Sequence, residues 1–375
     1  MRLNDWVIEN GSVLRDGEMT QTPLSIEAGH VTDMSPATAR RFDATGCYVL
    51  PGIVDVHGDG FERVVNPRPG VSFALPLALE EADRQMIANG ITTAYHGLTA
   101  SWEPGERSVG AARAFLAGLD TARPRLDCDT RVNLRWEAFC LDDLEEIAGW
   151  VETRPDILLS LNDHLSAYLK HDETSKKIAR MADRTGLSRA DCIAAVHRQN
   201  ARRGEVPAAI ARMTEAALNA GRMIFAHDEM TPEERRTNRA LGVTTSEFPM
   251  SRDTAAEAIA AGEPVILGAP NVVRGGSQNN AIGAEESIAE GLCTALTSDY
   301  YYPALFHAAF TLADRGTLPL AGAWALVSSG PARAAGLTDR GTLGMGQRAD
   351  MIVVDRASRR LRAVFVAGRK VLDRE

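Results

Sequence analysis

The chain has 375 residues, of which 45% are hydrophobic and 24% are charged, so it can bury a large core. Its formal net charge is −9 at pH 7, and no basic cluster with interleaved aromatic residues occurs, which disfavours nucleic acid as a partner. The five cysteines are scattered without a C-x-x-C pair, and no run approaches the roughly 18 apolar residues of a membrane span. We therefore expect a globular, cytoplasmic protein without a disulfide framework, a signal peptide or a membrane partner.

The two ends of the chain predict short antiparallel strands. Apolar stretches at residues 6–14, 24–31 and 46–50 are separated by glycine turns. The tail from residue 341 returns to this pattern, with strand-like stretches at 349–355 and 361–372. We expect segments 1–50 and 341–375 to meet in one small β-sandwich domain.

Residues 51–340 predict a different architecture, in which strands alternate with helices. Amphipathic segments at 77–89, 109–123, 141–152 and 206–220 predict helices, several of them closed by a glycine. Apolar runs predict eight strands, at 53–57, 91–96, 131–137, 156–164, 223–228, 242–249, 264–270 and 292–299. Alternation of this kind implies a parallel sheet, and eight units over about 250 residues match an α/β protein with a (β/α)8 TIM-type barrel.

A polar, helical stretch at about 166–201 interrupts this barrel pattern. It is longer than an ordinary connection between a strand and a helix, so we expect a lid-like insertion at the barrel mouth. Lys170, Lys176, Lys177 and Arg180 could cover an anionic substrate, although a lysine run on a helix is more often a solvated face.

Side chains able to bind metals recur where the predicted strands end. His57 and Asp59 close the first strand and point to the same side, because side chains in a strand alternate. The set of strand-end residues is His57, Asp59, His96, Glu137, His164, His227, Glu247, Asn271, Arg274 and Asp299. Imidazoles with carboxylates suit a borderline divalent metal, for which zinc is the first candidate and manganese or iron are alternatives. One or two ions fit this set, and the roles of His96, Glu247 and Glu62 stay open.

The segment after the seventh strand predicts a phosphate site. Asn271, Arg274, Gly275, Gly276 and Ser277 lie in a glycine-rich stretch that offers one guanidinium, a hydroxyl and backbone amides. Arg68, just beyond the first strand, is a further candidate. A plain flexible loop is the alternative interpretation of the same residues.

Several motifs together resemble the amidohydrolase superfamily. They include Leu50-Pro51-Gly52-Ile53-Val54-Asp55-Val56-His57, Gly268-Ala269-Pro270-Asn271-Val272-Val273-Arg274-Gly275-Gly276-Ser277, Ser298-Asp299-Tyr300-Tyr301 and Gly344-x-Gly346-x-x-Ala349-Asp350. The resemblance extends along nearly the whole chain, although Asp59 stands where most relatives carry a second histidine. Within the superfamily, the chain resembles the diphosphatases that cleave α-D-ribose 1-methylphosphonate 5-triphosphate in the carbon–phosphorus lyase pathway.

The resemblance implies a metal-dependent hydrolase of a small phosphorylated sugar, acting at the α-phosphorus in phosphonate catabolism. His57 and Asp59 would hold one ion and His164 and His227 the other, while Glu137 would bind or bridge. Asp299 would be both ligand and general base. A homo-oligomer is compatible with this interpretation.

Two other functions remain open at this stage. The same centre could hydrolyse an amide or cyclic amide, the commoner chemistry of the superfamily. A metal-free barrel that serves only in assembly is the third hypothesis.

Overall fold

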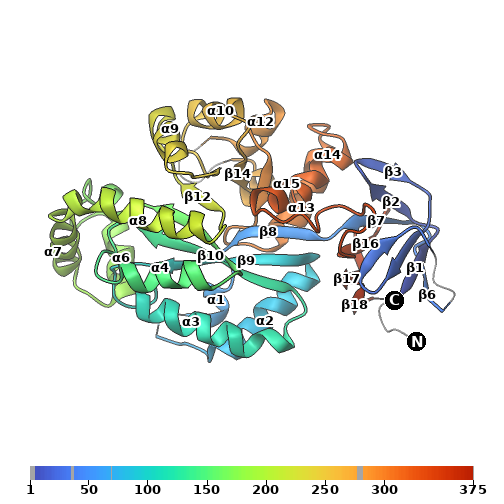
Figure 1. The fold of residues 1–375 in the computed structure, drawn as a ribbon, viewed down its shortest axis with the longest axis horizontal. Helices are drawn as coiled ribbons and strands as arrows, with labels where there is room; N and C mark the ends of the chain where they lie inside the picture. Colours follow the sequence, from blue (N-terminus) through green and yellow to red (C-terminus); the bar gives the residue numbers. More distant parts are fainter. Residues whose placement is uncertain (1–4, 35–37, 69, 277–281, 375) are drawn as a thin grey trace.

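The computed structural model describes residues 5–34, 38–68, 70–276 and 282–374. Figure 1 shows the strands from the two ends of the chain together at the right and the helix-covered remainder at the left. Within these ranges, no helix combines the length and apolar character needed to cross a membrane.

The larger part is an eight-stranded parallel sheet that curls into a barrel. Its strands follow the chain order around the sheet: β8 (Ile53–Gly58), β9 (Ile91–Ala100), β10 (Asp129–Glu137), β11 (Ile157–Asn162), β12 (Ile224–His227), β13 (Thr245–Glu247), β14 (Val265–Gly268) and β15 (Ala295–Thr297). The last strand returns to the first, since Gly58 forms a parallel bridge with Asp299. The predicted (β/α)8 fold is therefore confirmed.

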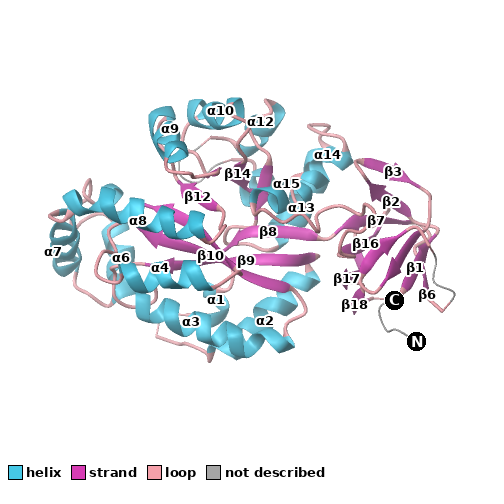
Figure 2. Cartoon of the chain, in the orientation of Figure 1, coloured by secondary structure: helices cyan, strands magenta, loops and turns pink. Residues whose placement is uncertain are grey.

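Helices follow the strands and cover the outside of the barrel, as the cyan ribbons of Figure 2 show. They are α1 (Glu62–Val65), α2 (Leu75–Ala88), α3 (Val109–Ala122), α4 (Leu144–Thr153), α8 (Val206–Asn219), α9 (Pro232–Ala240), α10 (Arg252–Ala260), α11 (Ala269–Arg274), α12 (Ala284–Ala289), α13 (Pro303–Asp314), α14 (Leu320–Ala325) and α15 (Ser329–Ala334). Several begin with a side-chain cap, as where Ser108 accepts a hydrogen bond from the amide of Ala111 at 3.2 Å.

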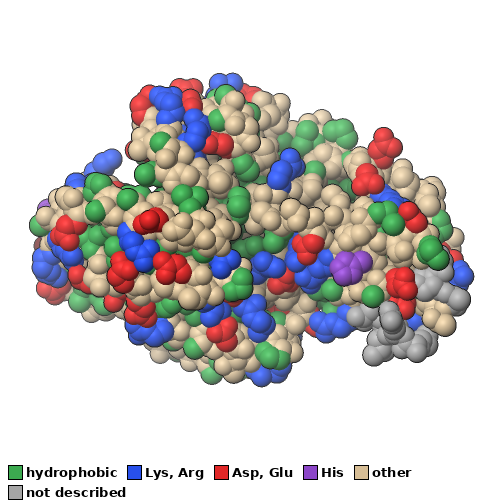
Figure 3. All heavy atoms as spheres, in the orientation of Figure 1, with side chains coloured by type: hydrophobic (Ala, Val, Ile, Leu, Met, Phe, Trp, Pro, Cys, Tyr) green, Lys and Arg blue, Asp and Glu red, His purple; other side chains and the backbone are tan. Residues whose placement is uncertain are grey.

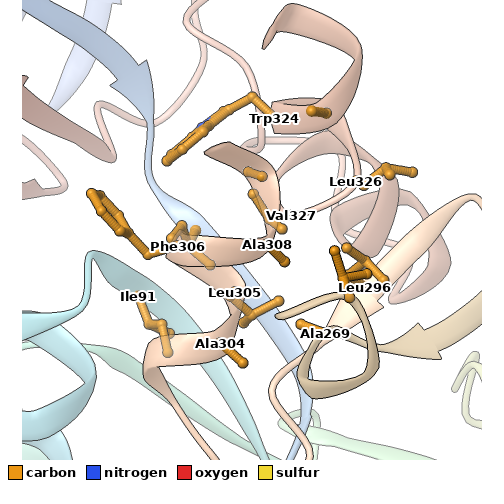
Figure 4. Packing of buried hydrophobic residues seen from close by; sticks show 14 of the residues in the cluster. Ile91, Ala269, Leu296, Ala304, Leu305, Phe306, Ala308, Trp324, Leu326 and Val327 are labelled. Atoms are coloured by element: carbon orange, nitrogen blue, oxygen red, sulfur yellow. The ribbon is translucent and has the colours of Figure 1, made fainter. Parts of the chain in front are cut away.

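Apolar side chains of α13 and α14 pack against the barrel strands. Figure 4 shows Leu305 and Phe306 among Ile91, Leu296 and Trp324 in this cluster. Burying one such side chain contributes about 1.5–3 kcal/mol. Trp324 also donates its indole N–H to the carbonyl of Pro51 at 3.0 Å, which ties α14 to the start of the barrel.

The two β-rich ends form a sandwich of two sheets. One sheet contains β1 (Trp6–Glu9), β4 (Leu24–Glu27), β5 (His30–Thr32) and β6 (Arg40–Asp43), and the other contains β2 (Ser12–Arg15), β3 (Glu18–Thr20), β7 (Cys47–Pro51), β16 (Met351–Asp355), β17 (Leu361–Val366) and β18 (Arg369–Asp373). Trp6 from the first sheet meets Phe365 from the second edge to face, with ring centroids 5.3 Å apart. Strands from both chain ends thus share one core, as predicted for the fold.

Only Gly52 separates the sandwich strand β7 from the barrel strand β8. A Cβ at this position would lie 2.2 Å from the hydroxyl oxygen of Thr92, so no larger residue fits without displacing β9. This glycine lets the chain pass from one part to the other without a linker.

The insertion contains three helices, α5 (Leu165–Tyr168), α6 (Lys176–Thr185) and α7 (Arg189–Asn200). Figure 1 places α6 and α7 at the end of the molecule opposite the sandwich. Phe139, Ile178 and Met181 are buried in one apolar cluster beneath these helices. Arg184 of α6 pairs with the buried Glu103 and donates to the hydroxyl of Tyr168 at 3.2 Å. The insertion is therefore packed onto the barrel rather than loosely attached.

The prediction of a glycine-rich loop is wrong for residues 271–274. These residues belong to α11, which begins at Ala269 and ends where Gly275 adopts a left-handed conformation with φ of 79°. Pro270 suits the first turn of a helix and Gly275 suits its end, so local signals favour a short helix here. Ser277 lies outside the described residues.

Charges of both signs alternate on the face shown in Figure 3. Among the charged pairs of the helices, Arg212 of α8 pairs with Glu145 and Glu152 of α4 at 2.9 and 3.0 Å. Exposed pairs of this kind each contribute little stability, about 0–1 kcal/mol. The absence of a nucleic-acid partner stays a prediction.

Candidate metal centre at the barrel mouth

Closure of the barrel brings Asp299 next to the end of β8. The amide of Asp299 donates to the carbonyl of His57 at 3.0 Å, and the amide of Asp59 donates to the carbonyl of Asp299 at 2.6 Å. Beneath them, the buried carboxylate of Asp55 accepts from the hydroxyl of Thr297 at 2.6 Å and the amide of Ser298 at 3.0 Å. Residues more than 240 positions apart are thereby fixed side by side.

Three residues within two positions of a barrel strand end adopt the left-handed backbone conformation. They are Asp228, Phe248 and Asp299, with φ of 59°, 54° and 54°. Such strain costs about 1–3 kcal/mol for a non-glycine residue and tends to collect at functional sites. Each amide is held by the neighbouring strand, as where Asp228 donates to the carbonyl of Glu247 at 3.0 Å. The turns aim these side chains at the mouth.

Glu247 orients two imidazoles at once. It is fully buried, and its two oxygens lie 2.8 Å from Nδ1 of His57 and 2.8 Å from Nδ1 of His227. Asn133 and Ser160 donate to the same carboxylate at 3.1 and 2.9 Å. Because a carboxylate accepts only, each Nδ1 donates, and Nε2 of each ring is left for the mouth.

These contacts also set the pKa values of the group. Burial would raise the pKa of Glu247, but His57 and His227 outweigh it and hold the pKa well below its usual range. Burial disfavours the charged form of His57, yet the charges of Glu247 and Asp59 prevail and raise its pKa to about 10. The base of the mouth therefore attracts a positive charge.

Glu137 holds His164 rather than facing the mouth alone. One of its oxygens is hydrogen-bonded to Nδ1 of His164, and the other accepts from the backbone amide of His164 at 3.1 Å. Nε2 of His164 then lies 3.9 Å from the carboxylate of Asp228. In this structure Glu137 acts as the orienting carboxylate of a histidine, a common arrangement behind a metal ligand.

One carboxylate oxygen of Asp59 has no hydrogen-bond partner among the described residues. This oxygen, Oδ1, is buried and lies 3.5 Å from Nε2 of His57. Gly97 makes room for it, since a Cβ there would come within 2.2 Å. A buried, unpaired carboxylate oxygen beside an imidazole nitrogen is costly unless a cation completes it, so these residues fit a divalent metal.

Asp299 is partly shielded from solvent at the same site. Burial raises the pKa of its carboxyl to about 6, and the charge of Asp59 adds to this effect while His57 opposes it. A carboxyl with this pKa is mostly ionised at neutral pH and can still accept a proton.

A cavity of about 470 Å³ opens above these groups. Its lining residues are His57, Asp59, Arg107, Arg135, His164, Arg180, His227, Asp228, Phe248, Met250, Gly268, Asn271, Asp299 and Tyr300. Arg180 reaches the cavity from helix α6 of the insertion, so this segment borders the cavity. Its action as a lid stays a prediction.

The predicted site residues divide into two groups. His57, Asp59, His164, His227, Asn271 and Asp299 line the cavity, with Glu137 directly behind His164. Arg274 is exposed at the end of α11 and donates to the hydroxyl of Tyr300 at 3.3 Å. Arg68, Gly275 and Gly276 are exposed and are not among the lining residues.

Three arginines line the cavity: Arg107, Arg135 and Arg180. The sequence analysis named only Arg180, as part of the expected lid, and did not predict Arg107 or Arg135 as site residues. Arg135 precedes Glu137 by two positions on β10, so strand alternation could have placed both on one face. Arg107 lies in the connection between β9 and α3 and carries no local signal.

His96 stands at a predicted strand end, yet it is not part of the cavity. Its ring is buried against Phe61 and Phe115, with centroids 4.8 and 5.8 Å away, and burial lowers its pKa to about 4. It is a neutral packing residue and is not among those lining the cavity.

Comparison with known proteins places this arrangement in a family. A model of the amidohydrolase family matches residues 140–371, more than half of the chain. The chain belongs to the amidohydrolase family. Members of this family typically bind a divalent metal, and two triads here have ligand atoms within 4.8 Å of one another: His57, His227 and Glu247, and His164, His227 and Asp228.

One curated protein similar to this chain has a name that states its substrate. The α-D-ribose 1-methylphosphonate 5-triphosphate diphosphatase of Escherichia coli (strain K12) is 29% identical over 367 residues, covering 93% of this chain and 95% of the relative. Among solved structures, phenylurea hydrolase B has a TM-score of 0.67 at 15% identity, covering 98% of this chain and 96% of the other. A β-aspartyl dipeptidase from Fervidobacterium islandicum AW-1 has a TM-score of 0.63 at 16% identity, covering 100% and 97%. The two structures share the amidohydrolase fold with this chain.

Proposed function

We propose that this amidohydrolase is a metal-dependent diphosphatase that converts α-D-ribose 1-methylphosphonate 5-triphosphate to the 5-phosphate and pyrophosphate. The observation that carries the proposal is the convergence of Arg107, Arg135 and Arg180 on one cavity. Guanidinium groups match the oxygens of phosphate, whereas a neutral amide substrate gains little from three cations. The named substrate of the Escherichia coli relative supports the same class.

The metal would be held by the donors described above. His57, Asp59 and Asp299 form one set of ligands, and His164 and His227 form the other, with Glu137 and Glu247 orienting the imidazoles. When bound, a divalent ion, for which zinc is the first candidate, supplies Lewis acidity and lowers the pKa of water.

The protein side chains would bind and orient the triphosphate. Arg107 and the lid residue Arg180 are placed to pair with the outer two phosphates. Asn271 lines the same wall, and Arg274 acts through the hydroxyl of Tyr300. Closing these groups around the substrate excludes water other than the nucleophile.

Hydrolysis at the α-phosphorus requires one proton acceptor and one stabilised leaving group. The oxygen of water forms a bond to the α-phosphorus, and its proton passes to the carboxylate of Asp299. The bond between the α-phosphorus and the oxygen bridging to the β-phosphate breaks, and pyrophosphate leaves with the electron pair. Arg107 and Arg180 stabilise the charge that develops on this leaving group.

Product analysis in ¹⁸O-labelled water tests the proposal. We expect the purified enzyme to release pyrophosphate and to place the label in the sugar 5-phosphate. Label in pyrophosphate, or orthophosphate as the first product, would contradict attack at the α-phosphorus. A parallel panel of amides and cyclic amides, with ammonia and amine detection, tests the alternative amidase function. Full activity in chelator, with no metal found by elemental analysis, would contradict any metal-dependent mechanism.

A further inference from the structure

A second cavity, here called the side pocket, adjoins the mouth. It has a volume of about 430 Å³ and is lined from α1, α3 and the end of β9. Its apolar walls are formed by Phe61, Val65, Phe73, Leu75, Leu98 and Phe115. An apolar cavity of about 150 Å³ is enough to hold benzene, so the side pocket has room for an aromatic ring. The proposed function uses none of these apolar side chains.

The walls of the side pocket are held in place by the fold. Phe61, Leu98 and Phe115 are buried, and the rings of Phe61 and Phe115 have centroids 4.9 Å apart. On the outer side, the amide of Phe73 donates to the carbonyl of Val65 at 2.9 Å. The ring of Phe73 is half-exposed, so an apolar ligand would remove part of it from water, which is favourable. The pocket is therefore formed before any ligand enters.

Arg107 joins the side pocket to the mouth, because it lines both cavities. Its charge favours the ionised carboxylates of Asp59 in the mouth and Glu62 in the side pocket, lowering the pKa of each. The carbonyl of Arg107 accepts from the amide of Ser101 at 2.9 Å, which fixes the backbone here. Among the described residues its guanidinium forms no direct ion pair. A cation therefore stands at the junction and is available to a ligand.

Thr99 offers a polar group at the same junction. Only 6% of this residue is exposed, and its hydroxyl oxygen has no hydrogen-bond partner within the described ranges. Thr99 is the register partner of Arg135 on β10, so both side chains point toward the mouth. A buried hydroxyl without a partner is costly, and an oxygen of a ligand would satisfy it. Glu62 and Glu106 also line the side pocket, so a ligand should place no second negative charge inside it.

We propose that the side pocket binds the aromatic ring of an aryl phosphonate or aryl phosphate, whose anionic group lies at the junction with Arg107 and Thr99. The inference goes beyond the proposed function and does not depend on it, because the ring uses neither the metal ligands nor the site of cleavage. Such a ligand would occupy Arg107 and would therefore compete with an anionic substrate of the mouth.

Phenylphosphonate and methylphosphonate test this inference, because the two probes share one anionic group and differ in the apolar group. Isothermal titration of the protein as purified should show phenylphosphonate binding about 10–100-fold more tightly, the effect of burying a ring of this size. Ala114→Trp, from an exposed position of α3 that lines the side pocket, should fill the space and abolish the preference. Phe73→Ser should reduce it by opening the outer wall. Ala117→Trp is the matched control, since Ala117 is exposed on the same helix and does not line the pocket.

Arg107→Gln tests the position of the charge and should weaken both probes by a similar factor. Equal affinities of the two probes for wild type, or no detectable binding of either, would overturn the inference. A preference that survives both Ala114→Trp and Phe73→Ser would also overturn it, because the ring would then lie elsewhere. Undiminished binding to Arg107→Gln would overturn the placement of the anion. Thermal unfolding identifies a misfolded variant, and the two pocket substitutions serve as replacements for each other. These measurements involve no hydrolysis, so the proposed function stands or fails separately.

Discussion

Glu247 and His57 are 190 residues apart in the chain and are hydrogen-bonded at 2.8 Å between Oε1 and Nδ1. The other oxygen of the same carboxylate lies 2.8 Å from Nδ1 of His227. One buried anion thus fixes the direction of two imidazoles whose Nε2 atoms face the cavity. The geometry of the mouth depends on this residue even though it does not line the cavity.

The first prediction concerns Glu247→Gln. An amide has one accepting oxygen and one donating nitrogen, so one imidazole must lose its partner or reverse its tautomer. We expect the affinity for Zn²⁺ or Mn²⁺ to fall by about 10–100-fold, the usual effect of removing an orienting carboxylate. Isothermal titration measures it. Ser160→Ala is the control, because it removes one donor to Glu247 but neither imidazole contact. Equal affinities in both variants would contradict this role.

The second prediction concerns Asp299→Asn. An amide cannot accept the proton of the attacking water, so kcat should fall by about 10²–10⁴-fold, and by more if the carboxylate also binds the metal. Substrate binding, measured on the inactive variant by competition, should change far less. A variant that keeps more than a tenth of wild-type kcat would exclude Asp299 as the base.

The pH dependence of the wild type follows from the same carboxyl. Its pKa is raised to about 6, mainly by burial, and the base is active only when ionised. Activity should therefore increase as pH rises toward 6, which gives the pH–activity profile an acidic limb. A bound cation would move this limb to lower pH. The limb should be missing from the residual activity of Asp299→Asn. An unchanged limb in that variant would assign it to another group.

The third prediction concerns Arg107→Gln and Arg180→Gln. Each should raise KM for a triphosphate substrate, because a charge-assisted hydrogen bond contributes about 1.5–3 kcal/mol, or roughly 10–100-fold. Arg113→Gln is the matched control, since this arginine lies on α3 and pairs with Glu146 outside the cavity. A similar KM in all three variants would argue against an anionic substrate.

The fourth prediction concerns stability at the opposite end of the barrel. Asp129, at the start of β10, pairs with Arg340 and accepts from Arg348 at 2.9 Å, which holds the segment leading to β16. Asp129→Asn would remove the carboxylate that these two guanidinium groups share, although Arg340 keeps Asp339 and Arg348 keeps Asp350 as partners. We expect a cost of about 1.5–3 kcal/mol, the range for a hydrogen bond to a charged group. Urea unfolding measures the loss. Glu146→Gln, in an exposed pair, should cost less than about 1 kcal/mol.

Asp129 also predicts a pH effect on stability. Burial would raise its pKa, but Arg131 and Arg340 outweigh burial and hold the pKa well below the usual range. A carboxyl with a lower pKa in the folded state stabilises the protein above its unfolded pKa of about 3.9, and this contribution is lost as pH falls below that value. Wild type should therefore lose more stability than Asp129→Asn between roughly pH 5 and pH 3. Parallel losses in the two proteins would contradict the assignment.

The sequence by itself determined the barrel and placed most of the candidate metal ligands at its mouth. Apolar strands alternating with amphipathic helices allow few other folds, and parallel strands end at one edge. His57, Asp59, His164, His227 and Asp299 could be placed at that edge because each stands at or just after a strand end. The glycine-rich sequence predicted a loop at residues 271–274, and this prediction was wrong. Pro270 lies in the first turn of a short helix there, and Gly275 ends it.

Only the tertiary structure decided how these side chains pair. Glu137 was predicted as a ligand, yet β10 and β11 align it with Asn162, and this register brings its carboxylate to His164. The position of Arg135 between Asp59 and His227 depends on three strands at once. Arg107 and Arg180 come from two separate connections whose paths no local pattern fixes. Residue type and strand periodicity are local properties, whereas the hydrogen-bond partner of a buried charge is set by register and barrel closure.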